Sequence, residues 1–325
     1  MKKSLLFILN SFLLLFPKAS IFPVNVKEIN YLLDSIEIGN PVYNENLTIF
    51  PIYRNNKSKE YNFTLLEEAL KKNYLKITEL DGGNVPEVNI TNKSDKIIFL
   101  MGGEVITGCK QDRIVARDVI IDSKRKDLIV PVYCVEQGRW SYNSNNFYSK
   151  KNLGTYKLRA EAQKSNGEQS KIWSEVSKYV TKNNVKSRSY NYQDIYENEE
   201  VNEKIKSIEK DLSNIINLKN NTTGVIIAIG DQVISIDIFT SPSIFKEYWP
   251  KILKSSAFSS VNEKNKKRIT INSVMKFIQK LRSKDFLKKE VIDLGEEYSL
   301  MNNEINVNSI IYKNNIIHLA GFPGE

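Results

Sequence analysis

The sequence has very few of the side chains from which most metal and thiol sites are made. Its 325 residues include one histidine, His318, and two cysteines, Cys109 and Cys134. Structural zinc sites use four ligands, mostly cysteine and histidine at short spacings, so no metal site is predicted. Two cysteines also exclude a dense disulfide framework. Whether Cys109 and Cys134 pair with each other in an oxidising compartment stays open from the sequence.

Familiar phosphate-binding and catalytic motifs are also missing. The sequence contains no glycine-rich phosphate loop, no nucleophile elbow and no paired-histidine motif. The net charge of +9 is mild for this length, and the one basic cluster, residues 264–268, has no interleaved aromatic side chains. Nucleic acid is therefore not an expected partner, because single-strand binding combines a positive groove with aromatic stacking. None of these patterns indicates a cofactor.

Only one long apolar run is present, and it lies at the N-terminus. Two lysines precede the run from Leu5 to Phe16, which is shorter than the roughly 20 residues of a membrane-spanning helix. Such a segment is typical of a signal peptide, so residues 1–20 are predicted to direct export to the periplasm, the envelope or the medium. Pro17 and Lys18 make a poor cleavage site, which leaves an uncleaved N-terminal anchor as the alternative. That anchor is the only membrane contact expected.

Residues 21–325 are predicted to form a single α+β domain. A hydrophobic share of 41% is enough to bury a full core. Short alternating segments between turn residues predict a sandwich-like antiparallel β-sheet in the N-terminal half, packed with helices, and a mixed αβ C-terminal part. Strands are expected over 36–53 (two strands with a turn near 44–46), 75–80, 87–91, 97–101, 113–121, 128–135, 225–229, 232–239, 287–294, 305–312 and 316–320, and helices over 65–72, 172–180, 201–215, 242–253 and 271–281.

Three of these elements carry local start or turn signals. Thr64 and Glu67 have the spacing of a capping box, which predicts that Thr64 caps the helix that follows it. Ser241 followed by Pro242 predicts another helix start, with serine as the N-cap. Gly230 and Asp231 together predict a tight hairpin turn.

A dense polar stretch follows one of the predicted strands. It reads Gly102-Gly-Glu-Val-Ile-Thr-Gly-Cys-Lys-Gln-Asp-Arg113 and includes Glu104, Lys110 and Gln111. The two leading glycines permit a tight turn. In an extended chain, Lys110 would lie on one strand face and Gln111 with Arg113 on the other. Polar side chains on both faces at the start of a strand indicate a mouth or a cleft.

A second polar stretch ends the predicted strand 128–135. Glu136, Gln137, Gly138, Arg139 and Trp140 follow it directly. An arginine beside a tryptophan can bind an anion and stack on a planar ring. The functional interpretation is a binding site made by the two strand ends. The structural interpretation is a buried Glu136–Arg139 network with Trp140 in the core, and the sequence leaves both open.

Together, the segments Gly102 to Arg113 and Pro131 to Trp140 resemble the ADP-ribosylglycohydrolase- and rhodanese-phosphatase-associated protein domain family. The resemblance runs from about Ile36 to His318. It implies a role near NAD or ADP-ribose metabolism, inferred from the genomic neighbours after which the family is named, and it implies no established catalytic residues. The candidate site residues at the family's motif positions are Glu104, Lys110, Gln111, Arg113, Glu136, Arg139 and Trp140.

Three functions stay open from the sequence. The first is an exported module that binds a small anionic or nucleotide-like ligand through Lys110, Gln111, Arg113, Arg139 and Trp140. The second is a hydrolase or transferase linked to NAD or ADP-ribose, with Glu104 or Glu136 as general base. The third is a structural or interaction protein of the envelope. Thiol chemistry at Cys134, with His318 as the only histidine base, is a minor alternative.

Overall fold

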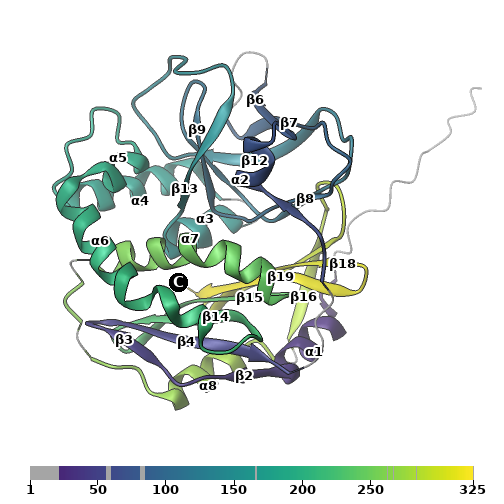
Figure 1. Cartoon of the computed structure of the whole chain (residues 1–325), viewed down its shortest axis with the longest axis vertical. Helices are drawn as coiled ribbons and strands as arrows, with labels where there is room; N and C mark the ends of the chain where they lie inside the picture. The colour runs from purple at the N-terminus through teal and green to yellow at the C-terminus, as the bar shows by residue number, and fades with distance from the viewer. Residues whose placement is uncertain are drawn as a thin grey trace, which may run out of the picture.

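The computed structural model describes residues 22–55, 60–80, 85–164, 167–261, 263–265, 267–282 and 284–324. The predicted signal segment, residues 1–20, lies outside them. Within the described part, helices are combined with mostly antiparallel sheets, which confirms the predicted α+β class (Figure 1). No helix in these ranges is both long enough and apolar enough to cross a membrane.

The larger sheet has ten strands and occupies the lower half of Figure 1. Its strands are β1 (Val24–Asn25), β2 (Ile36–Ile38), β3 (Val42–Asn44), β4 (Leu47–Arg54), β14 (Thr222–Ile229), β15 (Gln232–Phe239), β16 (Asp285–Lys289), β17 (Glu296–Met301), β18 (Ile305–Tyr312) and β19 (Asn315–Pro323). They lie in the order β1-β16-β17-β18-β19-β15-β14-β4-β2, with β3 paired to β4. The hairpin between β14 and β15 turns at Gly230 and Asp231, as the sequence predicts.

Helices cover both faces of this sheet. On one face lie α1 (Lys27–Ser35) and α8 (Ile271–Gln279), whose apolar residues share a buried cluster with the strands. The long helix α7 (Pro242–Ser260) crosses the other face, where Trp249 and its neighbours pack on β14 and β15. Each large side chain buried in this way contributes about 1.5–3 kcal/mol of hydrophobic free energy. In Figure 1, α7 lies between the larger sheet and the smaller sheets.

Two smaller sheets form the other half. The six-stranded sheet has the order β13-β9-β10-β12-β7-β6, and the three-stranded sheet has the order β11-β8-β5. Helix α2 (Leu66–Lys71) packs against both of them. The strand bounds are β5 (Thr64–Leu65), β6 (Leu75–Glu79), β7 (Glu87–Asn92), β8 (Ile98–Leu100), β9 (Glu104–Gly108), β10 (Arg113–Val115), β11 (Val119–Ile121), β12 (Leu128–Cys134) and β13 (Phe147–Leu153).

A helical segment connects the two halves. It consists of α3 (Tyr156–Gln163), α4 (Gln169–Lys182), α5 (Tyr192–Glu197), α6 (Glu199–Leu212) and the 3-10 helix η1 (Ser213–Asn217). Val105 of β9 and Ile114 of β10 are buried among the apolar residues of α3 to α6 and the end of α7. The helices therefore hold the polar motif strands from one side.

Several predicted elements differ in the structure. The strand expected over 113–121 is two strands in different sheets, because Asp118 turns away to accept a hydrogen bond from the Gly102 N–H at 2.7 Å. The capping box is wrong: Thr64 belongs to β5, and the α2 N-cap, Leu65, makes no side-chain cap bond. Ser241 is the N-cap of α7 but also makes no cap bond. Strands β1, β9, β13 and β17 and helices α1, α3 and α5 were not predicted.

Candidate functional site

The two polar motifs meet at neighbouring strand ends. Arg113, the first residue of β10, lies directly opposite Cys134, the last residue of β12. The prediction that Lys110 and Gln111 lie on a strand is wrong, because residues 109–112 form the turn between β9 and β10. Cys109 has a left-handed φ of 47° in this turn. The turn brings Gln111 against the chain that leaves β12, where its Nε2 donates to the Glu136 carbonyl at 2.7 Å.

The Arg113 side chain is completely buried under this turn. Its Nη1 donates to the Gln111 Oε1 at 3.2 Å and to the Cys134 Sγ at 2.7 Å. Its Nη2 lies 3.4 Å from a carboxylate oxygen of Glu79, which also accepts the Lys110 N–H at 3.0 Å. Both terminal nitrogens of the guanidinium are thus bound by protein groups below the surface, while its buried Nε has no hydrogen-bond partner among the described residues. Arg113 therefore fixes the two strand ends to each other.

Arg139 forms a second set of buried ion pairs, beside the contacts of Arg113. Its Nε and Nη2 donate to the two oxygens of Glu136 at 2.9 and 2.6 Å, which is the bidentate arrangement that arginine favours with carboxylates. Nη2 also reaches Asp112 at 3.2 Å, and Nη1 donates to the Cys109 carbonyl at 2.6 Å. Ser189 donates to Glu136 at 2.8 Å from the loop before α5. The Glu136–Arg139 network of the structural interpretation, which the sequence left open, is therefore present in the structure.

Lys110 and Trp140 lie outside this network, at the surface. Trp140 is 52% exposed, so the interpretation that places it in the core is wrong. The Lys110 ammonium lies over the Trp140 ring, 4.9 Å from its centroid, and 5.3 Å from the centroid of the Tyr142 ring. These three side chains form an exposed cation–π cluster beside the buried ion pairs.

Glu104 lies apart from the other candidates, at the start of β9. It forms an ion pair with Lys251 of α7, and its other oxygen accepts the Met101 N–H at 2.8 Å. Lys251 also contacts both oxygens of Glu67 at 2.9 Å. Burial raises the pKa of Glu104 to about 7, while Lys251 opposes the rise. In the structure, the ion pair of Glu104 with Lys251 therefore connects the motif to α7.

The motif glycines lie against a row of buried charged side chains, which we call the charge chain: Arg159, Asp237, His318 and Asp118. Gly103 has a φ of +98°, and a Cβ there would lie 2.5 Å from the Cγ of Arg159 in α3. Arg159 contacts Asp237 at 2.5 Å, and His318 lies between Asp237 at 3.2 Å and Asp118 at 2.7 Å. Although burial alone would lower the pKa of His318, Asp118 and Asp237 raise it to about 9.

His318 is therefore a protonated, buried link between two carboxylates. It does not contact either cysteine. Both cysteines are free and buried, so the pairing that the sequence left open is absent from the structure. Burial raises the pKa of the Cys134 thiol to about 12 and that of Cys109 to about 11. Such thiols are inert as nucleophiles at neutral pH, which removes the basis for thiol chemistry.

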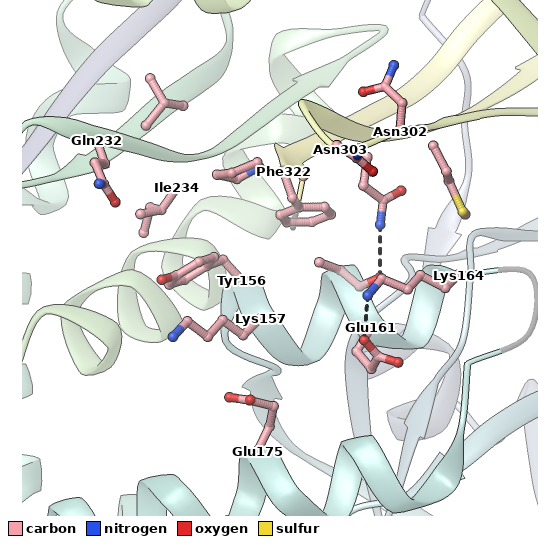
Figure 2. A pocket seen from close by; sticks show the side chains of 16 residues that line it. Tyr156, Lys157, Glu161, Lys164, Glu175, Gln232, Ile234, Asn302, Asn303 and Phe322 are labelled. Atoms are coloured by element: carbon pink, nitrogen blue, oxygen red, sulfur yellow. Dashed lines mark hydrogen bonds and ion pairs between the residues drawn. The ribbon is translucent and has the colours of Figure 1, made fainter.

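A cavity of about 630 Å³ opens on another side of α3, and sequence reasoning missed it (Figure 2). We call it the α3–β19 cavity. Figure 2 shows Tyr156 and Lys157 of α3 facing Gln232 and Ile234 of β15 and Phe322 of β19. It is lined by Tyr156, Lys157, Ala160, Glu161, Lys164, Glu175, Gln232, Val233, Ile234, Met301, Asn302, Asn303, Asn306, Phe322, Pro323 and Gly324.

The charge chain reaches the floor of this cavity. The guanidinium of Arg159 stacks on the Phe322 ring at 5.0 Å from its centroid, and Phe322 lines the cavity. Asn306 donates to the Ala160 carbonyl at 3.0 Å, which fixes β18 to α3 across the cavity edge. Glu104 and Glu136 do not line this cavity. The motif glycines therefore support the cavity wall from behind, while the candidate carboxylates lie elsewhere.

One local signal in the sequence was overlooked and could have indicated α3, the helix that forms this wall. Thr155 is its N-cap and accepts the Leu158 N–H at 3.4 Å, and the helix residues after it are good helix formers. The usual apolar stripe is weak, because the buried face of α3 includes the polar side chains of Arg159 and Gln163.

Comparison with known proteins gives one match. A family model described as the ARG and Rhodanese-Phosphatase-superfamily-associated Protein domain matches residues 35–322. No curated protein and no solved structure matches the chain. Within the described ranges, no group of three or more histidine, cysteine and acidic side chains is placed to hold a metal ion.

Proposed function

We propose that this chain, which belongs to the ARG and Rhodanese-Phosphatase-superfamily-associated Protein domain family, binds a small nucleotide-like ligand in the α3–β19 cavity. The observation that carries the proposal is the cavity itself. Its volume of about 630 Å³ lies within the range of about 300–1,000 Å³ that is usual for small-molecule sites. The family name links these chains to ADP-ribosylglycohydrolases, which makes ADP-ribose and related nucleotides the first ligands to test.

The lining has the two parts that such a ligand needs. Val233 and Ile234 supply an apolar floor against which a planar base can lie, and the fully buried Phe322 supports that floor from below. Amides of Gln232 and Asn303 stand at the rim and offer both donors and acceptors to ribose hydroxyls and base edges. An apolar floor with a few polar groups is the usual composition of a nucleotide-sized pocket.

The charges of the lining favour specific contacts over a general attraction for anions. Lys157 and Lys164 are balanced in number by Glu161 and Glu175. Lys164 forms an ion pair with Glu161 at 2.7 Å. Lys157 is exposed at the cavity mouth, where its ammonium is the group placed to meet a ligand phosphate. Recognition of the ring and hydroxyls is therefore expected to contribute more than net charge.

Ligand-dependent thermal stabilisation tests this proposal. A ligand at about a hundred times its Kd stabilises the folded protein by about 2.7 kcal/mol. We expect ADP-ribose, or a related nucleotide such as AMP or NAD, to raise the unfolding temperature of the wild-type protein. Ala160→Phe places a large ring in the cavity from a half-exposed position and is expected to abolish that rise. Ser174→Phe, at an exposed position of α4 outside the lining, is the matched control.

Two results would count against the cavity. One is the absence of stabilisation by every nucleotide in the panel. The other is stabilisation that survives Ala160→Phe but disappears in Trp140→Ala, which would place the ligand at the motif surface that the sequence favoured.

We also propose, from residues 1–20 alone, that the protein is exported. N-terminal sequencing of protein recovered outside the cytoplasm tests this, and an exclusively cytoplasmic protein with Met1 intact contradicts it.

A further inference from the structure

A second, smaller cavity of about 280 Å³ lies beside the polar motifs. We call it the Arg117 cavity. Arg117, in the bend between β10 and β11, and Tyr133 of β12 line it from the motif side. Gln163, from the end of α3, and Lys289, the last residue of β16, line it from the opposite side. The cavity therefore lies where the six-stranded sheet, α3 and the larger sheet meet.

Two cations in this cavity share one buried carboxylate. Arg117 Nη1 donates to an oxygen of Glu297 at 2.7 Å, and the Lys289 ammonium lies 4.0 Å from the other oxygen. The Glu297 side chain is only 3% exposed, and its Oε1 has no hydrogen-bond partner among the described residues. A single carboxylate can neutralise only one of the two cations. Glu290 also lines the cavity, but it is exposed and forms no ion pair with either cation among the described residues. Arg117 and Lys289 therefore share one close anion in a half-enclosed space.

Both cations retain hydrogen-bond donors. The two hydrogen bonds of Arg117 within the described residues leave from Nη1, toward the Glu290 carbonyl and Glu297. Its Nε and Nη2 therefore remain for another acceptor. Lys289 donates to the Gln163 carbonyl at 3.1 Å and to the Asn308 Oδ1 at 3.2 Å, which uses two of its three protons. Burial lowers the pKa of Lys289, Glu297 opposes the fall, and Arg117 adds to it, so the net shift is downward.

We infer that the Arg117 cavity binds a small tetrahedral oxyanion, of the sulfate or phosphate class, between Arg117 and Lys289. An oxyanion accepts several charge-assisted hydrogen bonds at once, and a guanidinium presents paired N–H groups that match two of its oxygens. The volume suits a single anion better than a whole nucleotide. This inference does not depend on the nucleotide proposed for the α3–β19 cavity, although Lys164 lines both cavities.

Glu297 makes the binding depend on pH. Burial raises the pKa of Glu297 to about 7, while Arg117 and Lys289 oppose the rise and Asp118 adds to it. Below about pH 7 the carboxyl is protonated, and the negative charge that competes with the bound anion disappears. Sulfate keeps its own charge across this range. Sulfate is therefore expected to bind more tightly at about pH 6 than at about pH 8.

Calorimetric titration with sulfate, and separately with inorganic phosphate, tests the inference in a chloride buffer of low ionic strength. We expect Arg117→Gln and Lys289→Gln each to weaken sulfate binding by at least about tenfold. Glu297→Gln keeps the shape of the side chain but removes its charge. It is expected to bind sulfate at least about tenfold more tightly at about pH 8 and to lose the pH dependence.

The gain in affinity separates this inference from a loss of folding, because a misfolded variant does not bind more tightly. Lys186→Gln removes a positive charge at an exposed position outside the lining and serves as the matched control. Ala160→Phe, which fills the α3–β19 cavity, is expected to leave sulfate binding unchanged. The inference is overturned if the wild-type protein binds neither anion, if both glutamine substitutions of the cations leave binding unaltered, or if Glu297→Gln fails to tighten it.

Discussion

Replacing Lys251 by methionine tests how the buried carboxylate of Glu104 is stabilised. The Lys251 side chain is 7% exposed and contacts both Glu104 and Glu67. Methionine keeps most of the volume but removes the charge, so two carboxylates are left facing each other without their cation. Removing one partner of a buried ion pair typically costs about 3–5 kcal/mol, because the remaining charge is desolvated and uncompensated.

The cost is expected to depend on pH in a defined direction. Burial raises the pKa of Glu104 above its ordinary value of 4.5, Glu67 adds to the rise, and Lys251 opposes it. Without Lys251 the pKa of the folded protein rises further, above about 7. A raised carboxyl pKa means that the folded protein holds a proton that the unfolded chain releases. Stability therefore falls as the pH rises from about 4.5 through the folded pKa, and the loss is complete above it.

Urea denaturation of Lys251→Met and wild type, at about pH 5 and about pH 8, measures this difference. We expect a loss of about 3–5 kcal/mol at the higher pH and less than about half of that at the lower pH. Lys246→Met, at an exposed position of the same helix, is expected to change stability by less than about 0.5 kcal/mol. A loss below about 1 kcal/mol at the higher pH, or an equal loss at both, would refute the reasoning.

Two further predictions concern the motif residues. Arg139→Ala is expected to lower stability by about 3 kcal/mol, because it leaves the buried carboxylates of Glu136 and Asp112 without their cation; Arg188→Ala, at an exposed site, is the control, and equal urea midpoints would contradict a structural role. Gly103→Ala is expected to cost about 1–3 kcal/mol through its positive φ and its contact with α3, and a neutral effect by thermal denaturation would disprove that constraint.

Local signals in the sequence predicted the elements that depend on local chemistry. The Gly230-Asp231 turn supports the hairpin of β14 and β15 wherever it lies in the fold. The spacing of Val201, Ile205 and Leu212 likewise predicted one apolar face on the helix α6. The break between β10 and β11 could not be predicted from local signals. It depends on Asp118, whose partner His318 is 200 residues away in the chain.

In the candidate site, too, features set by neighbouring residues could be predicted from the sequence, and features set by tertiary contacts could not. The sequence located the polar motifs and left a Glu136–Arg139 network open as one of two interpretations, since neighbouring charges at a strand end commonly pair. It did not separate buried Arg113 from exposed Trp140, because both lie at the ends of strands and only tertiary packing decides their burial. The α3–β19 cavity could not be predicted from the sequence, because its walls come from three separate segments, around residues 156–175, 232–234 and 301–324.

The central claim is that the α3–β19 cavity, and not the motif surface, binds a nucleotide-like ligand. A crystal structure of the protein with ADP-ribose measures this most directly. We expect ligand density in the cavity, with a planar ring against Val233 and Ile234 and polar contacts from Gln232 or Asn303. Ligand density at Arg139 and Trp140 with an empty cavity would contradict the claim.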